Sequence, residues 1–274
     1  MKKRIVLLTG DELRHQFFRK FIANENEINV LATYCESEKG NLNDLISKSN
    51  EVTDARVAHL KERELVENFF FKEYCEKVKD LSNPIKISKG QVNDKQCIEE
   101  VKELNPDIII AYGCSIITSS LLKLFKNKFI NIHLGLSPYY RGSGTNFWPI
   151  VNNEFHCIGT TFMHVDEGID TGEVIHQIRA VIYPWDNIHQ IGNRLIYNSF
   201  VECIKLVLKF EDLKKMKPIL LNKEKEKYYR NVNFTEKSVD IAKQHMVSNN
   251  LIKYLGNTSK LDVKYPIINN TALA

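Results

Sequence analysis

Short apolar runs alternate with helical patterns through the first half of the chain, and this alternation constrains the fold more than any other feature. Strands are expected at the apolar runs, which lie at residues 4–8, 29–33, 84–88, 107–111 and 129–134. The run at 107–111 holds three consecutive isoleucines, so both faces of that strand are apolar and must be covered. Strands of this kind are typical of parallel sheets that carry helices on both faces. The pattern therefore predicts an α/β fold with a mostly parallel sheet between two helix layers.

Capping residues indicate where the helices between these strands begin. Helices are expected at residues 12–23 after Asp11, at 52–79, at 95–104 after Asn93-Asp94, and after Ser119-Ser120.

The second half of the chain has a different order of elements. Two longer strands are expected at residues 156–165 and 173–183, and a helix capped by Asp186 is expected to end near residue 208. Residues 210–228 are rich in lysine and glutamate, which is typical of a linker. A helix capped by Thr235 and then a polar tail are expected to complete the chain.

Length and composition limit the kind of protein. The 274 residues accommodate one large domain and a small appendage. We expect a main domain over residues 1–208, followed by a linker and a small C-terminal extension over residues 209–274.

The charge balance and the cysteines argue against several partners. The chain has 38 basic and 34 acidic residues, and the net charge of +4 is too small to indicate a nucleic-acid-binding surface. No apolar run approaches the roughly 18 residues that a membrane span needs, and the run at residues 5–8 is too short for a signal peptide. Six scattered cysteines without a CxxC pair are typical of a reducing compartment. We therefore expect a cytoplasmic protein with no nucleic-acid partner, no membrane partner and no bound metal.

The strand at residues 129–134 carries two polar side chains on one face. Side chains alternate along a strand, so Asn131 and His133 share a face while Ile130 and Ile132 point the other way. Open α/β sheets bind ligands beyond the carboxyl ends of their strands, and a loop with three glycines, a proline and an arginine follows at residues 134–144. The alternative interpretation is a buried histidine with its hydrogen bonds satisfied, next to an asparagine that holds a turn.

A second group of polar residues lies at residues 166–172, where three carboxylates accompany two glycines. A solvated hairpin loop and a calcium loop are alternative interpretations. Calcium loops need oxygen ligands at alternating positions, and Gly168 and Thr171 interrupt that series, which disfavours a metal.

Three sequence blocks, taken together, resemble the folate-dependent formyltransferase family. They are Asn131-Ile-His133, then Pro138-x-x-Arg141-Gly142, then Asp166-Glu-Gly-Ile-Asp170-Thr-Gly172. Their order and spacing agree with a family that includes glycinamide ribonucleotide, methionyl-tRNA and nucleotide-sugar formyltransferases, and the resemblance is best over residues 107–182. It implies a Rossmann-like fold and N10-formyltetrahydrofolate as the formyl donor.

The resemblance also implies roles for particular residues. Asn131, His133 and Asp170 match the catalytic residues of the family, with Asn131 and a protonated His133 donating hydrogen bonds to the formyl oxygen and Asp170 accepting a proton or holding His133 charged. The residues that match the folate site lie in two loops and are Cys114, Ser115, Ile117, Val165, Asp166, Glu167 and Gly168.

Other residues are candidates from their chemistry alone. Arg141 and Trp148 are candidates for the acceptor pocket, through pairing with a phosphate and stacking on a base, with core packing as the alternative for Trp148. Arg14 and His15 are interpreted as part of a solvated helix face, with the crevice as the alternative.

Departures from the family pattern concern the acceptor more than the chemistry. Gly135 replaces a serine that helps to form the acceptor site, and the tail is short for the C-terminal domain of a methionyl-tRNA formyltransferase. We therefore expect an N-formyltransferase that acts on a nucleotide-linked amino sugar, with a homodimer left open. The alternatives are a formyltetrahydrofolate hydrolase, a methionyl-tRNA or glycinamide ribonucleotide formyltransferase, and a non-enzymatic folate- or nucleotide-binding module.

Overall fold

The computed structural model describes residues 1–37, 54–214 and 226–273. Seven strands form the main sheet, in the spatial order β3-β2-β1-β4-β5-β7-β8. The strands from β3 to β5 are parallel to one another, and β7 and β8 are antiparallel additions at one edge. In chain order the strands are β1 (Lys3–Gly10), β2 (Ile28–Ser37), β3 (Pro84–Ser88), β4 (Ile108–Tyr112), β5 (Phe129–His133), β7 (Gly159–Met163) and β8 (Val174–Arg179). The expectation of a mostly parallel α/β sheet is confirmed.

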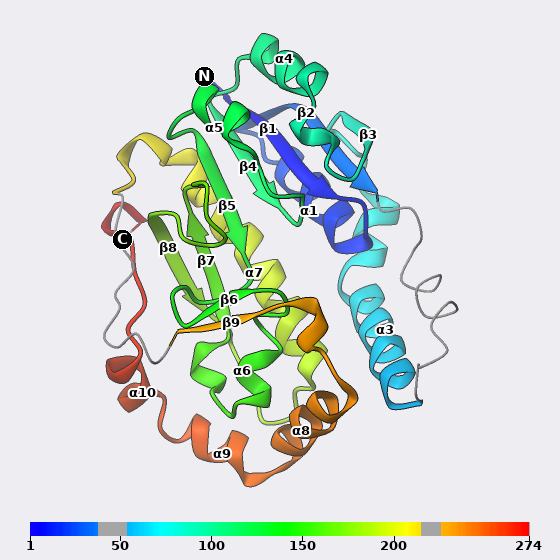
Figure 1. The fold of residues 1–274 in the computed structure, drawn as a ribbon, viewed down its shortest axis with the longest axis vertical. Coiled ribbons are helices and arrows are strands. Elements are labelled where there is room, and N and C mark those ends of the chain that lie inside the picture. The colour runs from blue at the N-terminus through cyan, green and yellow to red at the C-terminus, as the bar shows by residue number, and fades with distance from the viewer. Residues whose placement is uncertain (38–53, 215–225, 274) are drawn as a thin grey trace.

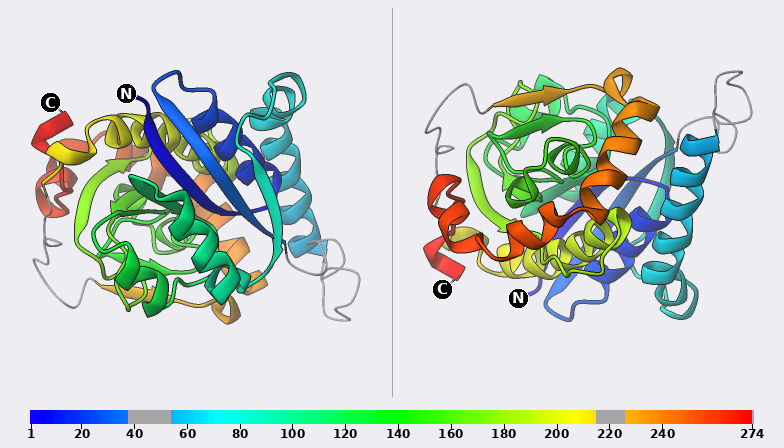
Figure 2. Two further views of the ribbon diagram at one scale, coloured as in Figure 1. Left: turned by 90° about the horizontal axis from the view of Figure 1, so that it is seen from above. Right: turned by 90° about the horizontal axis from the view of Figure 1, so that it is seen from below.

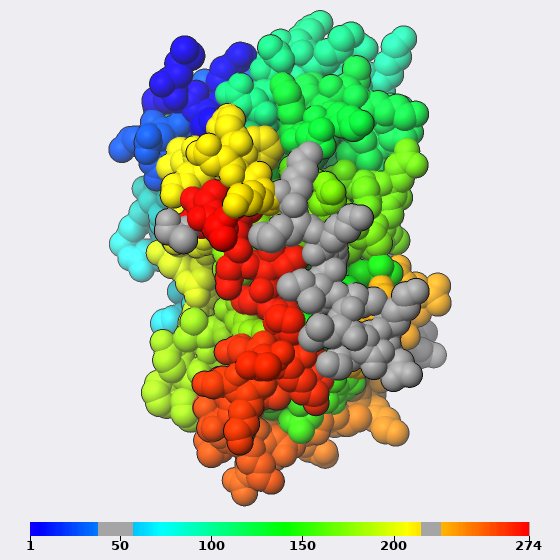
Figure 3. Space-filling model, turned by 90° about the vertical axis from the view of Figure 1, so that its left-hand side faces the viewer, coloured from blue at the N-terminus to red at the C-terminus, as the bar shows by residue number. Residues whose placement is uncertain are grey.

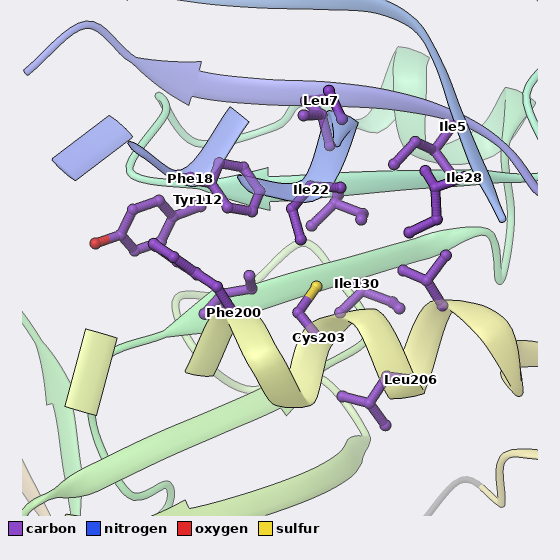
Figure 4. Close-up of a cluster of buried hydrophobic side chains, with 14 of the residues drawn as sticks. Ile5, Leu7, Phe18, Ile22, Ile28, Tyr112, Ile130, Phe200, Cys203 and Leu206 are labelled. Atoms are coloured by element: carbon purple, nitrogen blue, oxygen red, sulfur yellow. The ribbon is translucent and has the colours of Figure 1, made fainter. Parts of the chain in front are cut away.

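Helices cover both faces of this sheet, as the views in Figure 1 and Figure 2 show. Along one strand, Ile5 and Leu7 enter a cluster covered by α1, α3 and α7, whereas Val6 and Leu8 enter a cluster covered by α4 and α5. Figure 4 shows the first cluster, in which Phe200 and its neighbours on α7 pack against the sheet. The helices of the main domain are α1 (Leu13–Ala23), α3 (Asp54–Lys77), α4 (Lys95–Leu104), α5 (Ser119–Leu124), α6 (Trp148–Val151) and α7 (Ile188–Leu208).

The strand order creates a crevice beyond the carboxyl ends of two neighbouring strands. The chain leaves β1 toward β2 and β3 on one side, and then returns to β4 and β5 on the other side. Because the connections diverge between β1 and β4, the loops after these strands separate there, and ligands of open α/β sheets bind at such a point.

The expected element boundaries hold in several places and fail in others. The strand at residues 84–88 and the helix at 95–104 are confirmed. The strand expected from residue 156 begins only at β7, because Phe155–Cys157 forms a 3-10 turn, in which the ring of His156 packs against Tyr265. Asp186 does not cap α7; the N-cap is Asn187, and the Asp186 carboxylate pairs with Arg194 at 2.7 Å.

The C-terminal part contains more structure than a linker and a polar tail. A short strand, β9 (Lys227–Tyr229), lies inside the expected linker and pairs in parallel with β6 (Tyr140–Gly142); residues 215–225 of that linker lie outside the described residues. The helix capped by Thr235 is confirmed as α8 (Glu236–Val247), and α9 (Asn249–Leu255) and α10 (Thr258–Lys264) follow it.

The segment after α10 packs along the outer edge of the sheet. The N–H of Gln177, in β8, donates to the carbonyl oxygen of Ile268, and the N–H of Ile268 donates to the side-chain oxygen of Gln177. Figure 3 shows this segment in red, lying across the surface of the molecule.

The expected division of the chain into a main domain over residues 1–208 and an extension over residues 209–274 stays a prediction. In the parts of the chain that the structure describes, none of the helices has the length and apolarity of a membrane span.

Candidate active site

Two polar side chains lie on one face of β5 near its carboxyl end. Ile130 and Ile132 enter the core cluster beneath α7, so Asn131 and His133 lie on the opposite face, as the strand alternation predicts. The strand is hydrogen-bonded to β4 on one side and to β7 on the other. The pair is therefore held by a central strand of the sheet. His133 is buried and Asn131 is partly buried.

The carboxylate of Asp170 reaches His133 from the loop between β7 and β8. Its Oδ1 lies 3.2 Å from Nδ1 of His133, and its Oδ2 accepts a hydrogen bond of 3.0 Å from the N–H of Gly142. Asp170 has a φ of 53°, in the left-handed region that aspartate tolerates better than most residues. The structure therefore brings together the two segments that the sequence analysis assigned to one site.

The second ring nitrogen of His133 indicates where the protons lie. Nε2 is 3.2 Å from the carbonyl oxygen of Tyr140, and Nε2 carries a hydrogen because a carbonyl oxygen only accepts. Nδ1 then faces the carboxylate of Asp170, which also only accepts when it is ionised. Both contacts are satisfied when one proton lies between Nδ1 and Oδ1. This proton-sharing pair can therefore give up or take a proton at the site.

Asn131, His133 and Asp170 all line one cavity of about 1530 Å³ beyond the carboxyl ends of β4 and β5. Pockets for a single drug-sized ligand are usually about 300–1,000 Å³. The cavity is therefore large enough for two ligands side by side. It extends from the loops after β4 and β7 to α1, α3 and the first turns of α7.

Most of the site residues expected from the sequence are at this cavity. In addition to the three above, its lining includes Cys114, Ser115, Ile117, Val165, Asp166, Gly168 and Trp148. Two expected residues are not part of the lining: Glu167 is exposed in its loop, and the Arg141 guanidinium lies 2.9 Å from the carboxylate of Glu226. Glu226 thus holds Arg141 beside β9, and neither Glu167 nor Arg141 lines the cavity.

Two carboxylates organise the backbone of the expected folate loops. Glu36, at the end of β2, is 6% exposed and accepts a hydrogen bond of 2.6 Å from the N–H of Ser115. Asp166 accepts bonds from the N–H of Gly168 at 3.0 Å and from the hydroxyl of Thr171 at 2.8 Å. These bonds hold the main chain of both loops in place beside the cavity. Sequence reasoning missed Glu36, since no local pattern distinguishes it from a surface residue.

Trp148 and Cys114 line the cavity but are packing groups. The Trp148 indole stacks on Tyr229 with ring centroids 4.2 Å apart, and its N–H donates to the carbonyl oxygen of Ser143. Burial raises the pKa of the Cys114 thiol to about 12. The thiol therefore stays protonated and is a poor nucleophile at neutral pH.

The first turn of α1 and one face of α3 form a further wall of the cavity. The expectation of a solvated helix face for Arg14 and His15 is wrong, because both line the cavity and His15 is only 9% exposed. Arg14 pairs with Glu67 of α3, with Nη2 and Oε2 2.5 Å apart. His59, Arg63 and Glu67 all line the cavity. Their spacing of four residues places them on one helix face and is the sequence signal that could have identified this wall.

The comparisons identify the class of protein to which this fold and site belong. The sequence model of the family described as formyl transferase matches residues 3–200, so the chain belongs to the formyl transferase family.

Among curated relatives, methionyl-tRNA formyltransferase of Clostridioides difficile is 29% identical over 165 residues, a match that covers 60% of this chain and 52% of that protein. A second one, from Desulforamulus reducens, is 37% identical over 125 residues, which cover 43% of this chain and 38% of that protein. The chain thus matches about half or less of the length of these relatives.

Solved structures share the fold at low sequence identity. The N-formyltransferase from Helicobacter canadensis, in complex with folinic acid and dTDP-3-aminofucose, has a TM-score of 0.53 and 18% identity, with 92% of this chain and 82% of that chain covered. This likeness shows the fold alone.

Proposed function

We propose that this chain transfers a formyl group from N10-formyltetrahydrofolate, the formyl donor of its family, to the amine of a small acceptor. The observation that supports this proposal is the 3.2 Å contact between His133 Nδ1 and Asp170 Oδ1, in a cavity that Asn131 also lines. The three side chains supply an amide donor and a mobile proton at one place. Formyl transfer needs both of these.

The amide of Asn131 stabilises the negative charge that develops on the formyl oxygen. When the acceptor amine attacks the formyl carbon, the carbonyl oxygen becomes an oxyanion. A fixed N–H donor aimed at that oxygen is typically worth about 3–4 kcal/mol of barrier lowering. Asn131 is suited to this role because its side chain is partly buried and lies on a rigid central strand.

The His133–Asp170 pair balances the protons of the reaction. The attacking nitrogen becomes positively charged as its bond to carbon forms, and it must lose one proton. The N10 nitrogen of the donor must gain one proton as its bond to carbon breaks. A carboxylate that accepts the first proton and an adjacent imidazolium that donates the second perform both transfers. The pair therefore ends the reaction with the proton count at which it began.

The donor and the acceptor have separate places in this proposal. The loops that hold Ser115 and Gly168 present ordered backbone groups suited to a flat polar ring such as a pteridine. The wall formed by α1 and α3 is then left for the acceptor. We propose a nucleotide-linked amino sugar as the acceptor. The size of the cavity supports this proposal, as does the dTDP-3-aminofucose bound to the Helicobacter canadensis protein of the same fold.

An acceptor panel tests the proposal. The protein is mixed with N10-formyltetrahydrofolate and, separately, with dTDP-3-aminofucose, other nucleotide-linked amino sugars, glycinamide ribonucleotide and methionyl-tRNA, and free tetrahydrofolate is measured. We expect tetrahydrofolate release that depends on a nucleotide-linked amino sugar. If only glycinamide ribonucleotide or methionyl-tRNA were consumed, the sugar would be rejected as the acceptor while the proposed formyl transfer would stand. Release of formate without any acceptor would indicate a hydrolase.

A matched pair of variants tests the role of the carboxylate. Asp170→Asn keeps the shape but cannot accept the amine proton, so we expect a loss in kcat of about 100- to 10,000-fold. Asp240→Asn makes the same change at an exposed position on α8 and is expected to leave turnover unchanged. Equal turnover of the two variants would rule out Asp170 as the proton acceptor.

A further inference from the structure

We propose that His15 is a specificity-determining residue, whose Nε2–H donates a hydrogen bond to an uncharged oxygen on the amine-bearing unit of the acceptor. This inference rests on the proposed formyl transfer and concerns the part of the cavity beside the carboxyl ends of β1 and β4.

The imidazole of His15 is held in one orientation. The backbone N–H of Glu12 donates to its Nδ1 at 3.2 Å, and the ring packs against Tyr112 with centroids 5.2 Å apart. Two glycines make room for it, since a Cβ at Gly10 would lie 2.7 Å from the ring and a Cβ at Gly113 would lie 2.4 Å from Nε2. Gly10 is the last residue of β1 and Gly113 directly follows β4, so the ring lies where the loops after these two strands diverge.

The same contacts determine what the ring can do. Burial, followed by the charge of Arg14, lowers the pKa of His15 to about 3, so the ring is neutral near pH 7. Because Nδ1 already accepts a hydrogen bond, the single hydrogen of the neutral ring is on Nε2. Nε2 has no hydrogen-bond partner among the described residues, and the residue lines the cavity. The Nε2–H group is therefore the hydrogen-bond donor of His15 that remains available to a ligand.

The charges around His15 indicate an uncharged partner. Arg14 is paired with Glu67 at 2.5 Å, and Arg63 is paired with Glu12 at 3.2 Å. Asp11 in the same loop is paired with Lys86 at 3.2 Å. The charged side chains near His15 are therefore already neutralised by one another. A phosphate at this point would meet a neutral imidazole and arginines that are already paired with carboxylates. A hydroxyl or carbonyl oxygen accepts from Nε2 without that penalty.

The place of His15 in the sheet indicates which part of the acceptor it contacts. The ring lies at the ends of β1 and β4, and Asn131 lies on β5, the next strand. Neighbouring strands are about 5 Å apart. Asn131 points to the face of the sheet opposite to α1, but His15 and Asn131 both line the same cavity, so an acceptor bound there can contact both. We therefore assign the contact to the unit that carries the amine.

Two substitutions separate donation from packing. His15→Leu keeps apolar volume and removes the donor, and His15→Gln keeps an N–H near the position of Nε2. His156→Leu is the matched control, because His156 is another buried histidine, with a similarly lowered pKa, and its residue is not part of the described cavity lining. The probes are dTDP-3-aminofucose and glycinamide ribonucleotide, two small amines that carry hydroxyls.

Calorimetric binding of each probe, and the KM of the probe that is formylated, give the readout. We expect the wild-type protein to bind at least one probe, His15→Leu to bind it about tenfold more weakly, and His15→Gln and His156→Leu to bind it like the wild type. The kcat and the KM for the formyl donor are expected to stay unchanged in His15→Leu. A purely structural role would instead raise the KM of both substrates.

The outcomes separate this inference from the proposed function. Binding of neither probe, or equal binding by His15→Leu and the wild type, overturns the inference about His15. If methionyl-tRNA is formylated while neither probe binds, the transfer stands and the His15 contact does not. If a probe binds through His15 but is never formylated, the His15 hydrogen bond is supported and the proposed formyl transfer is contradicted.

Discussion

Position 135 controls how closely the backbone approaches the proton-sharing pair. A Cβ at Gly135 would lie 2.5 Å from Nε2 of His133 and 2.6 Å from Cβ of Thr145. Neither neighbour is free to withdraw, because Nε2 is bonded to the carbonyl oxygen of Tyr140 and the Thr145 hydroxyl is bonded to the carbonyl oxygen of Leu134. The glycine that departs from the family pattern is therefore required by the packing around the imidazole.

Gly135→Ala is expected to displace the imidazole. Overpacking of this kind costs about 1–3 kcal/mol of stability, and a misplaced reacting group costs about 10- to 100-fold in rate. Urea denaturation measures the first effect and tetrahydrofolate release the second.

Gly256→Ala is the control for this prediction, since a Cβ there meets its nearest atom only at 3.7 Å. Its stability and turnover are expected to match those of the wild type. Wild-type turnover in Gly135→Ala would show that the imidazole can move without consequence.

Single residues were predictable where the determining pattern is local. The shared face of Asn131 and His133 follows from strand alternation, so it can be read from the sequence. The resemblance to the family assigned Asp170, whose approach depends on a left-handed residue in a loop. Glu36 was missed, and the crevice was only the alternative interpretation for His15. Both residues are distinguished by contacts with a backbone loop from another part of the chain, which no local pattern shows.

At the scale of elements, the segment after α10 completes the outer edge of the sheet. Asn270 is 3% exposed, and its side-chain N–H groups donate to the carbonyl oxygens of Ile175 at 2.9 Å and Lys214 at 2.8 Å. One side chain thus joins β8 to the chain beyond α7. The sequence shows only a polar asparagine near the C-terminal end, which is why a polar tail was expected.

Asn270→Ala is expected to lower the free energy of unfolding by about 2 kcal/mol, because it leaves two carbonyl oxygens without this donor. Urea denaturation measures the change. Asn257→Ala serves as the control: Asn257 is exposed, and its side chain donates only to the nearby carbonyl oxygen of Lys253 in α9. A change within about 0.5 kcal/mol is expected there. Equal losses in both variants would contradict a joining role for Asn270.

Apolar strands were the elements that the sequence revealed best. The strands β1, β2, β4 and β5 are marked by apolar runs that are buried in the two core clusters, whereas β3 is mostly exposed. By contrast, β9 is polar and exists because β6 offers a backbone partner. The turn at Phe155–Cys157 replaces an expected strand, because its place is set by packing against Tyr265 from the C-terminal segment. Elements formed by distant partners leave no local pattern.

At the scale of the whole molecule, buried neutral histidines couple folding to pH. Burial is the largest cause of a lowered pKa at five of these rings. The pKa is lowered to about 3 at His15 and His189 and to about 4 at His59 and His156, and it is also lowered at His176. In the unfolded chain a histidine titrates near its ordinary pKa of about 6.5.

The sign of the pH dependence follows from these shifts. Between about pH 6.5 and pH 4 the unfolded chain binds more protons than the folded protein, so stability falls as the pH falls. Above pH 6.5 both states hold neutral rings and the contribution is complete. At pH 5 each of the four rings with a pKa of about 3 or 4 is expected to cost on the order of 1–2 kcal/mol. Together these four rings amount to a large part of the roughly 5–15 kcal/mol that holds a typical domain together.

We therefore expect the urea midpoint to fall steeply between pH 7 and pH 5, before most carboxylates titrate. His156→Leu removes one of these rings, and His156 is not part of the described cavity lining. The stability that this variant loses between pH 7 and pH 5 should therefore be smaller than the wild type's loss by the contribution of one ring. The contribution of the carboxylates to the pH dependence cancels in this comparison, because the wild type and the variant carry the same carboxylates. A midpoint that stays constant between pH 7 and pH 5, or an identical slope in the variant, would mean that these histidines become protonated in the folded protein as readily as in the unfolded chain.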